Sequence, residues 1–437
     1  MSNKKHPKGL YLLFFTEMWE RFSYYGMRAL LVLYLTKSLI EGGLGFSEEN
    51  ATLLYGFFTG FVYITPLIGG WLSDNYLGKR KAITIGGVTM MFGQFFLAAQ
   101  SNIFFLYAGL FLLIVGNGFF KPNISVLVGD LYEPNDSRKD SAFTIFYMGI
   151  NLGAFFSPLI CGYLSIHYGY RLGFFAAGLG MLIGQLLFNL LGERFLGDIG
   201  KTPALVENCK SDKKKPLSQE EKDRTRVILI LVLFCVFFWA GFEQAGSSMT
   251  LYTEKFINRT FFGFNIPTSW FMSINPLFIV LFAPLFSSLW MWLNRRGKEP
   301  SVPVKMGMGM ILLGVGFLLM FVACVQRGGN NPDVTVKANL LFLVGAYLLH
   351  TFGELSLSPI GLSMVTKLSP LRLASLMMGV WFMSSFIANL AGGVIASYAS
   401  RMGAMEVFAA IAGISVVLGL VLISLNKWLV TKSHGKF

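Results

Sequence analysis

Glu17-Met18-Trp19-Glu20-Arg21-Phe22-Ser23-Tyr24-Tyr25 stands inside the first long apolar segment of the chain. This stretch places two carboxylates and one guanidinium where a membrane-spanning helix meets hydrocarbon. An ionisable group at that depth is costly unless it is paired or faces water. In a helix, Glu17, Glu20, Arg21 and Tyr24 follow i, i+3, i+4, i+7 spacing and share one face. We expect that face to point into a polar cavity, which indicates ion-coupled transport.

Composition indicates a polytopic membrane protein embedded in the lipid bilayer. The chain has 437 residues, of which 54% are hydrophobic and 14% are charged, against about 25% charged residues in soluble domains. The net charge of +13 lies mostly in loops, where Lys and Arg set orientation rather than bind nucleic acid. The four cysteines form no CxxC pair, so neither a disulfide framework nor a zinc site is predicted.

About twelve segments are long enough to span a bilayer at roughly 20 residues each. They run over residues 10–38, 50–75, 79–99, 103–131, 140–165, 171–195, 226–252, 269–293, 303–325, 336–364, 374–399 and 404–428. The basic loops all fall on one side if every segment spans, so both termini are predicted to be cytoplasmic. Residues 1–8 are too polar for a cleaved signal peptide, and the first helix is expected to remain as an anchor.

One polar linker divides the chain. The stretch from residue 197 to 225 is rich in Lys, Asp, Glu, Ser and Pro and has no apolar run. It separates an N-terminal six-helix bundle at 1–196 from a C-terminal six-helix bundle at 226–437. Such two-bundle transporters hold their substrate near the membrane midplane, between the halves.

The motif Glu-x-x-Glu-Arg-Phe-x-Tyr-Tyr resembles the first-helix signature of the proton-dependent oligopeptide transporter family, a branch of the major facilitator superfamily. Lys121-Pro122-Asn123 and Phe238-Trp239-x-x-x-Glu243-Gln244 are similar to further motifs of that family. The resemblance implies a proton-coupled symporter that imports di- and tripeptides, and peptidomimetics, by alternating access. Many bacterial relatives carry two additional helices between the halves, but the linker here is too short for them, so no inserted helix pair is expected.

The resemblance also implies a substrate site with opposite charges on its two walls. Arg28 and Lys121 would hold a peptide carboxylate, while Glu243 would hold its ammonium group, with hydrogen bonds from the amides. The residues alone leave two alternatives open, because Lys121 could instead snorkel to the interface and Asn151 could join helices. The expected substrate-binding residues are Arg21, Tyr25, Arg28, Tyr63, Lys121, Asn151, Trp239, Glu243, Asn275, Glu354, Ser358 and Trp381.

Coupling requires a group whose protonation changes the stability of one conformational state. Glu17, Glu20 and Arg21 are predicted to form the main coupling cluster, and a Lys121–Glu354 bridge a second switch. Protons would be the coupling ion, with no other cofactor and no metal. His350, four residues before Glu354 on the same helical face, is either a proton relay or, more commonly for a lone histidine on an apolar helix, a packing residue.

The loop motif containing Asp74, Lys79 and Arg80 resembles a cytoplasmic gate, in which Asp74 would pair with a nearby cation; simple topology anchoring is the alternative. Rival functions are a carrier of another small solute such as nitrate, a channel, and a non-transporting membrane sensor. No loop carries a nucleophile with its base, so an enzyme is not expected. We expect a monomer in the bacterial inner membrane, or plasma membrane.

Overall fold

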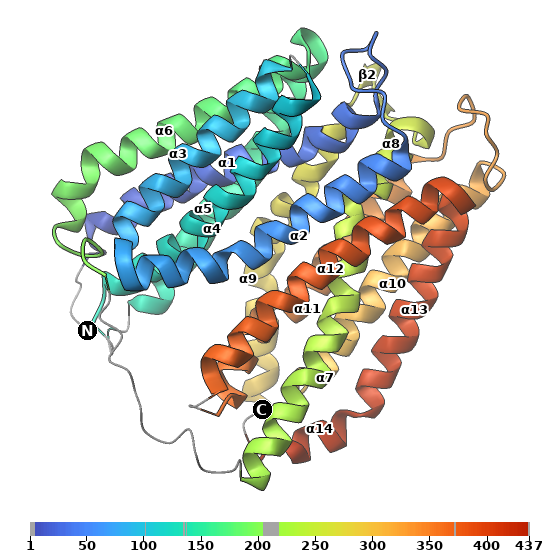
Figure 1. Ribbon diagram of the computed structural model, residues 1–437. Coiled ribbons are helices and arrows are strands. Elements are labelled where there is room, and N and C mark those ends of the chain that lie inside the picture. Colours follow the sequence, from blue (N-terminus) through green and yellow to red (C-terminus); the bar gives the residue numbers. More distant parts are fainter. Residues whose placement is uncertain are drawn as a thin grey trace. The chain divides into compact units, whose positions relative to one another are not determined.

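The computed structural model describes residues 5–100, 102–133, 136, 138–203, 218–370 and 373–435. Apart from one two-stranded hairpin, the elements that it describes are helices (Figure 1), so the all-α prediction is confirmed. The chain divides into two compact units. Unit 1 comprises Met1–Phe46, Phe61–Asn208 and Pro267–Pro276, and unit 2 comprises Ser47–Gly60, Cys209–Ile266 and Leu277–Phe437.

Unit 1 is built from six long helices and two short ones. The elements are α1 (Lys8–Thr36), the second half of α2 (Glu48–Leu72), the π-helix η1 (Ser73–Leu77), α3 (Lys79–Ala99), α4 (Ile103–Asp130), α5 (Lys139–Tyr168), α6 (Tyr170–Leu196) and the 3-10 helix η3 (Thr268–Ser273). Within it, α1 packs against α5 and α6, while α3 packs against α4 and α6.

Unit 2 contains the first half of α2 and the remaining elements. These are α7 (Gln219–Phe242), the 3-10 helix η2 (Glu243–Gly246), α8 (Ser248–Phe256), β1 (Thr260–Phe261), β2 (Phe264–Asn265), α9 (Ile274–Arg295), α10 (Val302–Gln326), α11 (Leu340–Leu368), α12 (Ala374–Met402), α13 (Ala404–Ser424) and α14 (Asn426–Lys432). The strands pair antiparallel, with Phe261 opposite Phe264. Helix α9 begins in one unit and continues in the other. The predicted domain boundaries at 196 and 226 stay a prediction.

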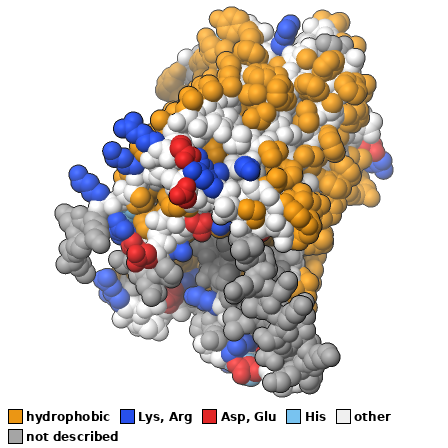
Figure 2. Space-filling model, turned by 60° about the vertical axis from the view of Figure 1, so that its left-hand side comes forward, with side chains coloured by type: hydrophobic (Ala, Val, Ile, Leu, Met, Phe, Trp, Pro, Cys, Tyr) orange, Lys and Arg blue, Asp and Glu red, His pale blue; other side chains and the backbone are white. Residues whose placement is uncertain are grey.

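Membrane-spanning helices make up most of the described chain. Eleven of its helical segments are long and apolar enough to cross a bilayer. The long helix α1 is not among them because Glu17, Glu20, Arg21 and Arg28 interrupt its apolar sequence. Figure 2 shows hydrophobic side chains over much of the face that it draws, as expected where lipid replaces water as the solvent.

Helix α7 begins before residue 225, where the predicted linker ends. Residues 219–225 belong to α7, which begins about two turns before the predicted helix. A capping box explains the earlier start: the Ser218 hydroxyl accepts from the Glu221 backbone N–H, and the Glu221 carboxylate accepts from the Ser218 N–H. These reciprocal bonds satisfy N–H groups that the first helical turn leaves without partners, so the charged sequence starts a helix.

Small residues allow the helices of each unit to approach closely. In unit 1, a Cβ added at Gly93 would lie 2.9 Å from the carbonyl oxygen of Gly109, so α3 and α4 meet backbone to backbone. In unit 2, a Cβ at Gly309 would lie 2.8 Å from the carbonyl oxygen of Gly353, which joins α10 and α11. Close backbone packing of this kind stabilises membrane helices where the hydrophobic effect between them is weak.

Candidate functional site

The charged face of α1 forms a buried ion-pair cluster in unit 1. Nε of Arg21 lies 2.9 Å from Oε1 of Glu17 and 2.5 Å from Oε2 of Glu20. All three side chains are no more than 7% exposed. Oε2 of Glu17 and Oε1 of Glu20 are buried and accept no hydrogen bond within the described part of the chain. The cluster has one more carboxylate than guanidinium groups, so it needs another cation or a proton.

Lys121 supplies a second positive charge near the cluster. It lies close enough to interact electrostatically with both Glu17 and Glu20, and its Nζ is 4.2 Å from the centre of the Tyr63 ring. Its helix is interrupted in sequence by Pro122, which removes a backbone donor. A hydrogen bond of 3.0 Å from Thr65 of α2 to the Ile114 carbonyl joins α2 to α4, the helix that carries Lys121. Arg21 and Lys121 together therefore balance the two carboxylates of this cluster.

Two further residues of the predicted set extend the same face of α1. Arg28 is buried at 8% exposure, and its guanidinium carbon lies 5.9 Å from the centre of the Tyr25 ring. The spacing from Arg21 to Arg28 is two helical turns, so both guanidinium groups stand on one side of the helix. Arg28 thus adds one more buried cation to the side of α1 that carries the cluster.

Asn151 and Asn275 both belong to unit 1. The Asn151 side-chain nitrogen donates to the Tyr147 carbonyl at 2.9 Å, so this amide is partly committed to its own helix. The segment before Asn275 packs on α5, because Trp270 donates to the Leu159 carbonyl at 3.0 Å. The sequence position of Asn275 places it in the C-terminal half, whereas its packing groups it with unit 1.

Unit 2 holds the remaining predicted substrate residues. Glu243 is buried at 7% exposure at the point where α7 gives way to η2, and Gln244 secures that break by donating to the Gly392 carbonyl of α12 at 2.9 Å. The predicted seventh span is therefore interrupted at the carboxylate. Glu354 on α11, Trp239 on α7 and Trp381 on α12 are half-buried.

Several parts of the predicted site are not brought together by contacts within a unit. Lys121 lies in unit 1 and Glu354 in unit 2, so the bridge between them stays a prediction. The Ser358 side chain lies outside the described residues. His350 is 2% exposed and its ring centre lies 4.6 Å from that of Phe317, which supports the packing interpretation.

The predicted gate forms ion pairs other than those expected. Nζ of Lys79 lies 2.6 Å from Oδ2 of Asp130, and Nη2 of Arg80 lies 3.2 Å from Oε2 of Glu193. Asp74, in η1, forms no ion pair among the described residues, so its part in a gate stays a prediction. The cations at the start of α3 instead join α4 and α6.

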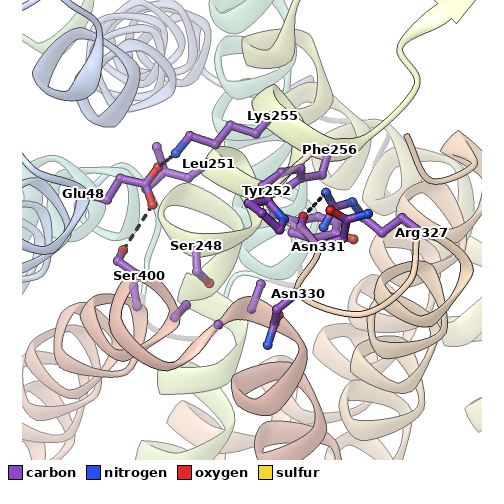
Figure 3. A pocket seen from close by; sticks show the side chains of 15 residues that line it. Glu48, Ser248, Leu251, Tyr252, Lys255, Phe256, Arg327, Asn330, Asn331 and Ser400 are labelled. Carbon is purple, nitrogen blue, oxygen red and sulfur yellow. Dashed lines mark hydrogen bonds and ion pairs between the residues drawn. The ribbon is translucent and has the colours of Figure 1, made fainter. Parts of the chain in front are cut away.

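A second ionic cluster, which sequence reasoning missed, lies at one end of unit 2. Glu48 pairs with Lys255 of α8, and Glu49 pairs with Arg401 of α12. Glu48 and Lys255 border a cavity of about 220 Å³, and Figure 3 shows Glu48 between Lys255 and Ser400. The Ser400 hydroxyl donates to Glu48 at 3.2 Å. The sequence signal for this cluster was the acidic loop that holds Glu48 and Glu49 and has no Lys or Arg. The partners of these two glutamates are distant in sequence, so the loop alone did not identify them.

Buried Arg327 fixes the other side of this cavity. Its guanidinium carbon lies 3.8 Å from the centre of the Phe256 ring. It donates to the carbonyl oxygens of Asn331 at 2.5 Å and Asp333 at 2.9 Å. A single side chain therefore orders the loop between α10 and α11.

Comparison with known proteins identifies the family. The family model described as PTR2, POT family, matches residues 80–203 and 201–412. The uncharacterized transporter YclF of Bacillus subtilis (strain 168) is 38% identical over 472 residues, covering 96% of this chain and 94% of the relative. A di-/tripeptide transporter of Lactococcus lactis subsp. cremoris is 32% identical over 481 residues, covering 96% of this chain and 95% of the relative.

A solved structure agrees with these matches. The peptide transporter POT, a mutant in complex with alafosfalin, shares 32% identity at a TM-score of 0.91, covering 99% of this chain and 97% of its own. The protein is an integral membrane transporter and not an enzyme. It belongs to the POT family, as the motif in α1 predicted. The two matched pieces meet at residues 201–203, within the predicted linker.

Proposed function

We propose that this protein is a proton-coupled symporter that imports di- and tripeptides, and peptidomimetics, by alternating access. The observation that carries the proposal is the balanced set of buried charges in unit 1: Glu17 and Glu20 against Arg21 and Lys121. A carrier that moves a proton needs a carboxylate whose charge matters to its neighbours, and such groups inside a membrane protein are typical of proton relays.

Substrate binding would change this balance. If a peptide carboxylate binds Lys121, the lysine charge is no longer available to the two glutamates. One glutamate beside Arg21 then carries an uncompensated negative charge, which proton uptake removes. Protonation and peptide binding would therefore stabilise the same state, which is the thermodynamic requirement for symport.

The peptide termini would be held by opposite charges. Arg28 and Lys121 would bind the carboxylate, and Glu243 the ammonium group, while Asn151 and Asn275 would donate or accept hydrogen bonds. This mode of recognition uses groups common to all short peptides, so it tolerates many side chains. The relatives named as a di-/tripeptide transporter and as a transporter bound to alafosfalin support this substrate class. Tyr25, Tyr63, Trp239, Trp381, Glu354 and Ser358 would line the remainder of the site.

The same proposal includes orientation, gating and assembly. Both termini would face the cytoplasm of a bacterial cell, with the protein working as a monomer in the plasma membrane. Lys79 and Arg80, which join α3 to α4 and α6, would hold the cytoplasmic gate together with Asp74. A Lys121–Glu354 bridge would close that side in the state without peptide.

Uptake into proteoliposomes tests the proposal. Labelled dialanine should accumulate under an inward proton gradient, and an ionophore that collapses the gradient should abolish accumulation. Glu20→Gln should remove gradient-driven accumulation yet retain exchange of labelled for unlabelled peptide, because exchange needs no net proton movement. Glu41→Gln, in an exposed loop, is the matched control and should behave as wild type. Full gradient-driven accumulation by Glu17→Gln and Glu20→Gln would refute the coupling assignment, and nitrate is the next substrate to test if dialanine is not transported.

A further inference from the structure

A groove lies between α3 and α6 in unit 1, apart from the residues assigned to substrate binding and proton coupling. It has a volume of about 630 Å³. Its polar end is formed by Arg80, Lys81 and Lys201, and its apolar side by Ile85 and Phe188. A hydrogen bond of 2.8 Å from Thr84 to Asn189 joins the two walls. The groove is therefore a built feature of two packed helices.

The polar end of the groove carries excess positive charge. Glu193 lies 3.2 Å from Arg80 and 2.5 Å from Lys201, and Asp198 lies 3.0 Å from Lys201. These two carboxylates do not balance the three cations that line the groove. Lys81 is exposed and has no ion pair within the described residues. An anion in the groove would meet a fixed arginine and a lysine that has no competing carboxylate.

The apolar side of the groove continues onto a lipid-facing surface. Ile85 of α3 is 42% exposed, and Leu186 and Leu190 of α6 are 50% and 74% exposed. Both helices are membrane-spanning, and Arg80 and Lys81 stand in the first turn of α3. The cations therefore lie at the end of two spans, at the depth where headgroups are found.

We propose that this groove binds an anionic phospholipid, with the headgroup phosphate between Arg80, Lys81 and Lys201 and an acyl chain along Ile85. The charge favours a phosphate, and basic pockets between membrane helices recognise anionic headgroups. The continuous apolar wall favours a lipid over a soluble phosphate, because a soluble anion gains nothing from it. Arg80 also donates to the Gly197 carbonyl at 2.7 Å, so a bound lipid would brace the end of α6 against α3.

Titration of the detergent-solubilised protein with lipid, followed by native mass spectrometry, tests this site. The probes are palmitoyl-oleoyl phosphatidylglycerol and the matched phosphatidylcholine. The wild type should bind phosphatidylglycerol more tightly. Each lysine near a headgroup contributes about fivefold in affinity, so the Lys81→Gln/Lys201→Gln double variant should bind about thirtyfold more weakly. Glu193→Gln should bind more tightly, because it removes a competing carboxylate.

Two controls make the outcome decisive. Lys222→Gln removes an exposed lysine on α7 and should leave binding unchanged. Lys81→Gln alone should lower the affinity for phosphatidylglycerol about fivefold. Lys81 has no ion pair to break among the described residues, so this single variant tests the site if the double variant misfolds. Equal binding of both lipids, an equal loss in Lys222→Gln, or displacement of phosphatidylglycerol by glycerol phosphate at matching concentration would each overturn the proposal.

Discussion

Replacing Gly153 with alanine should disturb the α1 cluster without changing a charge. Gly153 on α5 packs directly against α1, where an added Cβ would lie 2.9 Å from the Arg21 Cβ and 3.0 Å from the Phe22 backbone nitrogen. It would also overlap the Met18 carbonyl oxygen. Backbone atoms cannot rotate away as a side chain does, so α1 and α5 must separate by roughly 1 Å.

The size of the effect follows from that displacement. Overpacking of this kind lowers the free energy of unfolding by about 1–3 kcal/mol. A misplacement of roughly 1 Å at a functional site reduces activity by up to about a hundredfold. We therefore expect Gly153→Ala to lower the thermal midpoint and to reduce gradient-driven dipeptide uptake by one to two orders of magnitude, although all titratable groups remain.

Thermal unfolding in detergent and initial uptake rates in proteoliposomes measure the two effects. Gly413→Ala on α13 is the matched control, because a Cβ there meets no atom within 4 Å, and it should match wild type in both assays. Wild-type uptake and stability of Gly153→Ala would refute the close packing of α1 on α5 on which the account of the cluster depends.

Three other substitutions test separate parts of the structure. Asp223→Asn should speed hydrogen exchange in α14, because Asp223 holds Lys432 at 3.0 Å and His434 at 3.3 Å; unchanged exchange would exclude this clamp. Glu49→Arg should lower the thermal midpoint by repelling Arg401, and Arg401→Glu should restore it in the double variant; no restoration would argue against the pair. His350→Phe should keep gradient-driven accumulation, since the ring packs on Phe317; lost accumulation would favour the proton relay.

The sequence predicts best what depends on local geometry. The spacing of Glu17, Glu20 and Arg21 places them on one helical face whatever the rest of the chain does, and the ion pairs at 2.9 and 2.5 Å follow from that spacing. Long apolar runs likewise predict spans, because a bilayer leaves few other structures for such a segment.

Contacts between distant segments could not be predicted in the same way. Lys79 pairs with Asp130, and Glu49 with Arg401, although sequence proximity favoured Asp74 as the partner at the gate. These pairs depend on which helices become neighbours. The break of α7 at Glu243 is fixed by Gln244 bonding to α12, so it too is a tertiary feature.

The ends of helices could be predicted from the sequence only in part. Ser218 and Glu221 have capping-box spacing, so the sequence does contain a signal for the early start of α7. The charged residues around them indicated a polar linker instead. Asn275 could not have been assigned to unit 1, because that assignment depends on Trp270 donating to α5.

The most direct test of the central claim is proton movement driven by peptide alone. Proteoliposomes containing the protein and a trapped pH-sensitive dye would be given dialanine outside, with no proton gradient imposed and with potassium and valinomycin to prevent a membrane potential. The account predicts that dialanine acidifies the lumen, and that Glu20→Gln abolishes acidification while peptide exchange continues. Dialanine entry without acidification in the wild type would contradict proton coupling through the α1 cluster.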